Sequence, residues 1–184
     1  RLGLATGRPE RVATLVYTNV LRDFIRSATD ELKLPAEQVL TFDHWCRLRH
    51  VELIGPPPTS AQGHPDFTRI RQQLLAHLQS RAVPPALDAA LVDEGQDLDE
   101  DCFAILRLSA RHVTVAYDLK QSLYHEPEAR ELLRALGPGR REEDLRATYR
   151  ACPYVVDLAC EFIADEEERA AFRLNVATLQ TERQ

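Results

Sequence analysis

Short apolar segments alternate with amphipathic segments along most of this 184-residue chain. The segments with the β-branched, apolar character of strands are residues 12–17, 38–42, 87–92 and 112–116. Apolar residues at helical spacing follow these segments, so the pattern predicts βαβ units and a parallel sheet covered by helices on both faces. The sequence therefore predicts an α/β fold in which polar residues that follow the strands meet at one edge of the sheet.

The helices expected between and after the strands have recognisable ends. Asp66 is placed to cap a helix, and residues 55–65, with four prolines and two glycines, predict the loop before it. Pro153 lies at the first turn of a further expected helix. The expected helices lie near residues 21–32, after the caps Thr18 and Asn19, and near 43–48, 66–78, 102–106, 128–136 and 153–163.

Composition excludes several classes of protein. The formal net charge is −6, so the chain is no general basic coat for nucleic acid, although a local basic groove is compatible with this charge. No apolar run approaches the roughly 20 residues that span a bilayer, and no signal segment opens the chain. The cysteines lack zinc-ligand spacing and are too dilute for a disulfide scaffold. We therefore expect a cytoplasmic protein with no membrane partner and ordinary buried thiols.

Asp93 and Glu94 directly follow the apolar segment 87–92. Two adjacent carboxylates at a strand end are costly to bury unless a cation neutralises them, and magnesium with a bound phosphate does so. One carboxylate then holds the metal while the other orients water, as phosphoryl transfer requires. An acidic turn with solvated carboxylates is the alternative interpretation.

Two later segments extend this pattern. After the strand at 112–116, Gln121 has an amide that can contact a phosphate and a water, and Tyr124 can stack on a base. Farther along, Arg150 can act as an arginine finger, and the adjacent Tyr149 can stack on adenine. The alternative for Gln121 and Tyr124 is a polar turn with a tyrosine in the core. The alternative for Arg150 is an arginine on the surface.

Taken in order, these segments resemble motifs of superfamily 1 DNA helicases of the UvrD, Rep, PcrA and RecB group. Motif II is resembled by VDEGQD (92–97), motif III by VAYDLKQSLY (115–124) and motif IV by LRATYR (145–150). Upstream, LVYTN (15–19) is similar to motif Ia and LTFDHWC (40–46) to motif Ib. The resemblance covers roughly residues 12–160 and implies a RecA-like nucleotide-hydrolase fold, with ATP and magnesium as cofactors.

The resemblance implies a role for each matching residue at the ATP site. Asp93 corresponds to the magnesium ligand and Glu94 to the residue that activates water. Gln121 corresponds to the γ-phosphate sensor, Arg150 to the finger that reaches the γ-phosphate, and Tyr149 to the adenine-stacking position.

It also implies roles in DNA binding and in coupling. Single-stranded DNA, or a junction of duplex and single strand, is the implied partner. The implied strand-contacting residues are Thr18, Asn19, Thr41, Phe42 and Tyr124. The residues implied to couple ATP to DNA are Gln96, Asp97 and Asp118. We also expect Arg22, Arg26 and Trp45 to line a groove that holds single-stranded DNA.

The sequence departs from the family pattern at several positions. Tyr117 stands where the family usually has Gly before the motif III aspartate, and Asp43, followed by His44, stands where motif Ib commonly has His. Gly95 replaces a frequent Ala, a change that we expect to be mild.

The G-x-x-x-x-G-K-[ST] loop that cradles phosphates is not in the sequence. Because the chain also has no Met, we expect it to be a fragment whose phosphate loop lies upstream of Arg1. Residues 1–150 are then a truncated first RecA-like domain, with a short helical insert around 47–85. Residues 151–184 are a helical segment that leads toward a second RecA-like domain.

Two functions remain open on the sequence alone. The first is an ATP-dependent DNA helicase or translocase, inactive as this fragment but active as the full-length parent. The second is a degenerate, non-catalytic helicase-like module that binds DNA or a partner protein. A transporter ATPase fits less well, because the pair Tyr149-Arg150 does not suit that class. A phosphate loop upstream of Arg1 would favour the helicase hypothesis, and its absence would favour the non-catalytic module.

Overall fold

The computed structural model describes residues 11–32, 35–118, 141, 143, 153–167 and 169–173. The chain divides into two compact units, Arg1–Gly139 and Arg140–Gln184, and each is described by itself. The elements of the first unit are β1 (Val12–Val16), α2 (Asn19–Leu32), η2 (Ala36–Gln38), β2 (Val39–Thr41), α3 (Phe42–Leu53), α4 (Phe67–Ser80), β3 (Leu87–Val92), η3 (Gly95–Asp97), α5 (Glu100–Ser109) and β4 (Ala110–Val115).

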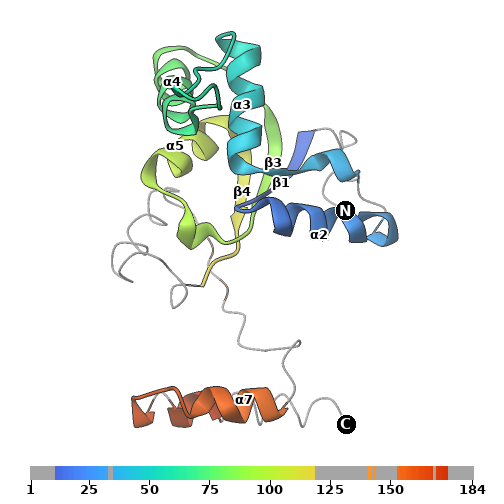
Figure 1. Ribbon diagram of the computed structural model, residues 1–184, viewed down its shortest axis with the longest axis vertical. Coiled ribbons are helices and arrows are strands. Elements are labelled where there is room, and N and C mark those ends of the chain that lie inside the picture. Colours follow the sequence, from blue (N-terminus) through green and yellow to red (C-terminus); the bar gives the residue numbers. More distant parts are fainter. Residues whose placement is uncertain are drawn as a thin grey trace. The chain divides into compact units, whose positions relative to one another are not determined.

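The four strands form one sheet in the order β2-β1-β3-β4, and every pair is parallel (Figure 1). This confirms the predicted α/β fold with a parallel sheet flanked by helices. The third predicted strand matches β3 residue for residue. The second is shorter than expected, because Thr41 caps a helix that already begins at Phe42.

The strand order decides which helices share a face of the sheet. The connection from β1 to β2 runs one way across the sheet, while the connections from β2 to β3 and from β3 to β4 run the other way. Because parallel crossovers are right-handed, α2 covers one face, and α3, α4 and α5 cover the other. Figure 1 shows these three helices grouped together and α2 apart from them.

The main core lies under α3, α4 and α5. Ala13 and Leu15 of β1 belong to this core, whereas their neighbours Val12 and Val16 are buried outside it, as the alternation of side chains along a strand requires. The helices contribute fully buried Phe103, among others. The largest buried side chains of the core are Leu15, Ile70, Leu74, Phe103, Ile105 and Leu106.

Side-chain caps fix where the helices of this face begin. Asp66 Oδ1 accepts a hydrogen bond from the Arg69 amide at 3.1 Å, which confirms the predicted cap of α4. Asp99 Oδ1 accepts from the Cys102 amide at 2.9 Å at the start of α5. Cys46, Cys102 and Cys160 are free and buried, as expected for ordinary structural thiols.

The second unit contains α7 (Pro153–Cys160), which ends three residues before the predicted end of that helix at residue 163. The helix predicted at 128–136 lies outside the described residues. The boundary between the units falls at Gly139–Arg140, before the position at residue 150 that the motif pattern gives. None of the described helices is long and apolar enough to cross a lipid bilayer.

Candidate functional site at the carboxyl edge of the sheet

The carboxyl ends of all four strands meet at one edge of the sheet. The register pairs Val16 with Thr41, Leu15 with Val92, and Val92 with Val115. We call this edge the carboxyl edge: it comprises residues 16–19, 41–44, 92–97 and 115–118. It brings together the predicted residues Thr18, Asn19, Thr41, Asp93, Glu94 and Asp118.

A strained turn follows β3 at this edge. Glu94 has φ 55°, and it is the one non-glycine residue with positive φ in the described part of the chain. Such a conformation costs about 1–3 kcal/mol and persists only where the surroundings hold it. Here the Glu94 amide donates to Asp93 Oδ1 at 3.1 Å, and the Gly95 amide donates to the Ala116 carbonyl at 3.0 Å. The turn directs the two acidic side chains to different partners.

The predicted coupling residue Gln96 bridges two motifs. Its side chain is buried, its Nε2 donates to Glu94 Oε2 at 2.6 Å, and its Oε1 accepts from the Asp118 amide at 3.0 Å. One amide group therefore ties the carboxylate after β3 to the backbone after β4. A buried amide with both ends bonded holds its partners in a defined geometry.

Gly95 is required by close packing. A Cβ at this position would lie 2.1 Å from Val115 Cγ1, so Val115 would have to shift, and the β-branched valine has few alternative rotamers. An Ala at this position, as in the motif pattern, would therefore not fit the turn of this chain unless Val115 shifted. The missing side chain lets the turn approach β4 closely enough for the Gly95–Ala116 hydrogen bond.

Asp97 lies beside Glu94 in the same turn. Its Oδ1 is buried and has no hydrogen-bond partner among the described residues. Desolvation, followed by repulsion from the Glu94 carboxylate, raises the pKa of Asp97 above its ordinary value. The turn thus concentrates negative charge that its own residues do not neutralise.

The chemistry of these donors fits a magnesium ion bound together with phosphate. Asp93 and Glu94 are half-buried carboxylates without an ion-pair partner in the described part of the chain. Magnesium is commonly held by one or two carboxylates, with phosphate and water oxygens completing its shell. No group of three or more His, Cys, Asp or Glu suited to a metal occurs among the described residues, so a metal here would need those further oxygens.

The residues implied to contact DNA follow β1 and β2. Thr18 and Asn19 are exposed; Thr18 Oγ1 accepts from the Leu21 amide at 3.2 Å, and Asn19 Oδ1 accepts from Arg22 at 2.8 Å. Thr41 is mostly buried, and its Oγ1 accepts from the His44 amide at 3.3 Å.

Two aromatic residues near this end lie in the interior. Phe42 and Trp45 are each 4% exposed, and their rings pack against each other with centroids 6.2 Å apart. The expectation that Trp45 lines a strand groove is wrong, because its ring belongs to the core. Phe42 can contact a DNA strand only through its backbone at the start of α3. Their apolar character, at the buried positions of an amphipathic helix, already favoured the core.

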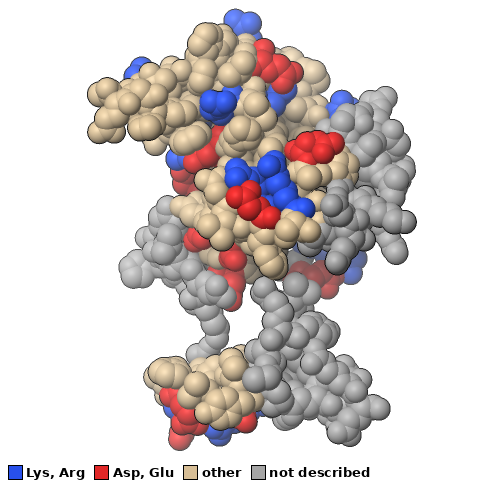
Figure 2. Space-filling view, turned by 45° about the vertical axis from the view of Figure 1, so that its right-hand side comes forward, with Lys and Arg blue, Asp and Glu red and all other residues tan. Residues whose placement is uncertain are grey.

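Charges at the carboxyl edge are divided between its two ends. We call the residues after β3 and β4 the acidic half: Asp93, Glu94, Asp97 and Asp118. We call the basic side chains on the helices after β1 and β2 the basic half: Arg22, Arg26, His44 and Arg47. Figure 2 shows basic groups gathered near the middle of the face that it draws, with acidic groups beside them.

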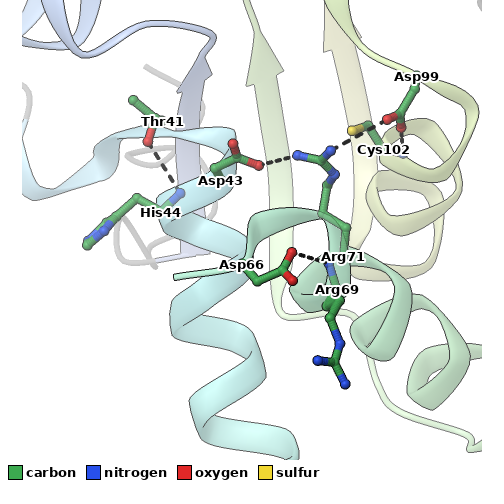
Figure 3. A network of polar contacts seen from close by, with 8 residues as sticks. All are labelled: Thr41, Asp43, His44, Asp66, Arg69, Arg71, Asp99 and Cys102. Atoms are coloured by element: carbon green, nitrogen blue, oxygen red, sulfur yellow. Dashed lines mark hydrogen bonds and ion pairs between the residues drawn. The ribbon is translucent and has the colours of Figure 1, made fainter. Parts of the chain in front are cut away.

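Arg71 links the starts of α3 and α5, and the sequence did not reveal it. Its guanidinium contacts Asp43 Oδ1 at 2.6 Å and Asp99 Oδ2 at 3.8 Å (Figure 3). Asp43 lies in the first turn of α3 and Asp99 is the cap of α5. Along the sequence Arg71 is one arginine of an amphipathic helix, and only the fold brings the two acids to it.

A hollow outlined by the described residues lies away from the carboxyl edge. It has a volume of about 260 Å³, and its walls include Val12 and Leu87, which begin β1 and β3. The candidate site is therefore the open carboxyl edge and not this hollow. The implied residues Gln121, Tyr124, Tyr149 and Arg150 lie outside the described residues.

A scan against protein-family models and searches of the curated proteins and of the solved structures found no match to this chain. A functional assignment therefore depends on the motif resemblance and on the geometry of the carboxyl edge.

Proposed function

We propose that this chain is most of the first RecA-like motor domain of an ATP-dependent DNA helicase or translocase. The Gln96 bridge is the observation that carries this proposal. Its amide contacts both Glu94, the proposed water-activating residue, and the backbone of Asp118 in the motif III segment. A motor needs such a connection between the site of hydrolysis and the strand-binding segments, whereas a passive scaffold does not.

The acidic half is the proposed place of ATP hydrolysis. Asp93 would hold magnesium, which when bound stabilises the charge that develops on the transferring phosphate. Glu94 would accept a proton from the attacking water. Gln121, Arg150 and Tyr149 would supply the phosphate sensor, the arginine finger and the adenine stack that the resemblance implies. The carboxylates of Asp93 and Glu94, which have no ion pair among the described residues, support this assignment.

The basic half is the proposed place of strand binding, with Thr18, Asn19, Thr41 and Tyr124 as contacts. Single-stranded DNA is held mainly by positive charge along its backbone and by stacking of its bases. A local excess of cations in a chain of net charge −6 supports this placement. Gln96, Asp97 and Asp118 are the proposed coupling residues, and the Gln96 side chain ties Glu94 to the backbone of Asp118.

The proposal is tested by replacing Glu94 in the protein expressed from the complete reading frame that contains this chain. Glu94→Gln keeps the size of the side chain and its bond to Gln96 but removes the proton acceptor. We expect ATP hydrolysis with oligo-dT to fall by about 100-fold or more, while binding of a fluorescent ATP analogue is retained. Measured rates and nucleotide affinities of the two proteins check both expectations.

Glu100→Gln is the matched control, because Glu100 is exposed in the first turn of α5. It should hydrolyse ATP at the wild-type rate. Normal hydrolysis by the Glu94→Gln protein would show that another residue activates the water. A wild-type protein that binds oligo-dT but never hydrolyses ATP would favour the non-catalytic module.

A further inference from the structure

The hollow at the amino end of the sheet has its cause in the strand register. β3 pairs with β1 from Val12 onward, whereas β2 pairs with β1 only from Thr14 onward. β2 thus begins too late to reach Val12 and Ala13, and the turn η2 precedes it there. The volume of about 260 Å³ is lined by residues of both β1 and η2, so it opens where the short strand stops.

The walls of the hollow are mostly apolar. Ala13, Trp45 and Leu87 belong to the main core, where each is at most 6% exposed. Val12 and Leu40 complete the apolar walls. Burying an apolar group against such walls removes it from water, which is favourable. Since a cavity of about 150 Å³ in another protein takes up benzene, about 260 Å³ is room for one ring with a short side arm.

Glu37 is the one charged side chain among the described residues that line the hollow. It lies in η2, whose backbone is held by the hydrogen bond from the Gln38 amide to the Pro35 carbonyl at 3.0 Å. Glu37 is exposed and has no ion pair in the described part of the chain, so its carboxylate lies at the rim, in contact with water. The hollow thus combines apolar walls with an acidic rim.

The arginines next to these elements have other partners. Arg11 directly precedes β1, but its guanidinium contacts the Pro85 carbonyl at 2.8 Å and Asp88 at 3.2 Å. Arg26 of α2 donates from its Nε to the Val39 carbonyl at 2.9 Å. Neither arginine is among the described residues that line the hollow. The negative charge at the rim therefore favours a ligand that brings its own cation.

We propose that the hollow binds a small organic amine, with its ring or short hydrocarbon body against Trp45 and its protonated nitrogen beside Glu37. The body supplies most of the affinity through burial, since an ion pair at a solvent-exposed rim contributes about five-fold at most. This site is separate from the proposed function. At about 3.3 Å per residue along a strand, Val12 lies about 13 Å from Val16 at the carboxyl edge.

Trp45 makes the binding measurable, because it is the only tryptophan of the chain. Phenethylamine is titrated into the 184-residue chain at neutral pH and constant ionic strength, while tryptophan emission is recorded. Phenethyl alcohol is the matched probe, since it has the same body without the charge. The amine should change the emission saturably and bind about three- to five-fold more tightly than the alcohol.

Glu37→Gln removes the charge at the rim and keeps the size of the side chain. The variant should bind both probes with the affinity that the wild type has for the alcohol. Glu100→Gln is the control, because Glu100 is exposed at the start of α5 and does not line the hollow. It should retain the wild-type preference for the amine. A preference that survives Glu37→Gln, or equal affinity of the wild type for the two probes, would overturn the proposal.

Ala13→Val adds two methyl groups at the wall of the hollow. A β-branched residue suits a strand, so we expect the fold to be kept, and circular dichroism checks this. Both probes should then bind at least about ten-fold more weakly. Unchanged binding by the folded variant, or no saturable change in wild-type emission, would overturn the site. If Ala13→Val does not fold, the comparison with Glu37→Gln decides alone. None of these measurements involves ATP or DNA, so the amine site and the motor proposal stand or fall separately.

Discussion

The two halves of the carboxyl edge belong to one sheet but have opposite electrostatic character. The acidic half gathers carboxylates after β3 and β4, and burial next to Glu94 raises the pKa of Asp97 there. The basic half gathers cations on α2 and α3, and the same kinds of effect lower the pKa of His44. A net charge of −6 thus coexists with two local regions of opposite sign. Overall charge alone is a poor guide to the ligands of such a chain.

The halves also differ in how they are held. The acidic half is fixed by the backbone: the Asp93 amide bonds to Leu15, and the Gly95 amide bonds to Ala116. The basic half is held by side chains, such as the bond from Arg26 to Val39. Outside both halves, Arg71 joins the starts of α3 and α5 through Asp43 and Asp99. We therefore expect substitutions in the acidic turn to affect stability most.

The largest expected effect on stability is that of Gly95→Ala. The added Cβ collides with Val115 Cγ1, so the free energy of unfolding should fall by about 2 kcal/mol. Urea denaturation measures this loss. The double variant Gly95→Ala with Val115→Ala removes the collision, so it should be less destabilised than the sum of its single changes. Simple additivity would mean that close packing is not what the acidic turn requires.

An intermediate effect is expected for Arg71→Met. Methionine keeps the aliphatic stem but leaves Asp43 and Asp99 without their shared partner, which should cost about 1–2 kcal/mol. Thermal unfolding compares it with Arg69→Met, two residues away, which should change stability by less than about 0.5 kcal/mol. Equal stability of the two variants would show that Arg71 does not stabilise the contact between α3 and α5.

A small effect of opposite sign is expected for Asp97→Asn. Because the folded-state pKa of Asp97 is raised, its ionised form costs stability above that pKa, and the cost disappears as the pH falls through it. The variant lacks the charge, so it should be more stable at pH 7 by about 0.5 kcal/mol. The difference should vanish in acid. A pH-independent difference, measured by urea denaturation, would point to a cause other than ionisation.

The sequence predicted what depends on local pattern. The apolar run from Leu87 to Val92 indicated a strand, and Asp66 indicated a helix start, because neighbouring residues alone determine both. It did not predict the left-handed backbone of Glu94, since Gly95 next to it is the residue that usually takes that conformation. The strain becomes visible only when the partners across the sheet are known.

Contacts between segments that are distant along the chain could not be predicted from the sequence. Arg71 meets Asp43 and Asp99 only because α4 packs against both α3 and α5. The prediction for Trp45 was wrong for a related reason. An aromatic residue near a polar motif can stack on DNA or pack in the core, and the face of the helix on which it lies decides between the two. Gln96 was named for coupling by resemblance, but its two bonding partners came from the fold.

The most direct test of a motor built on this edge is the rate of ATP hydrolysis by the protein from the complete reading frame, measured with magnesium in the presence and absence of oligo-dT. We predict that the oligonucleotide accelerates hydrolysis, because Gln96 ties Glu94 to the backbone of Asp118, in the segment that carries the proposed DNA contact Tyr124. Tight binding of the oligonucleotide with no magnesium-dependent hydrolysis of ATP, in either condition, would contradict it.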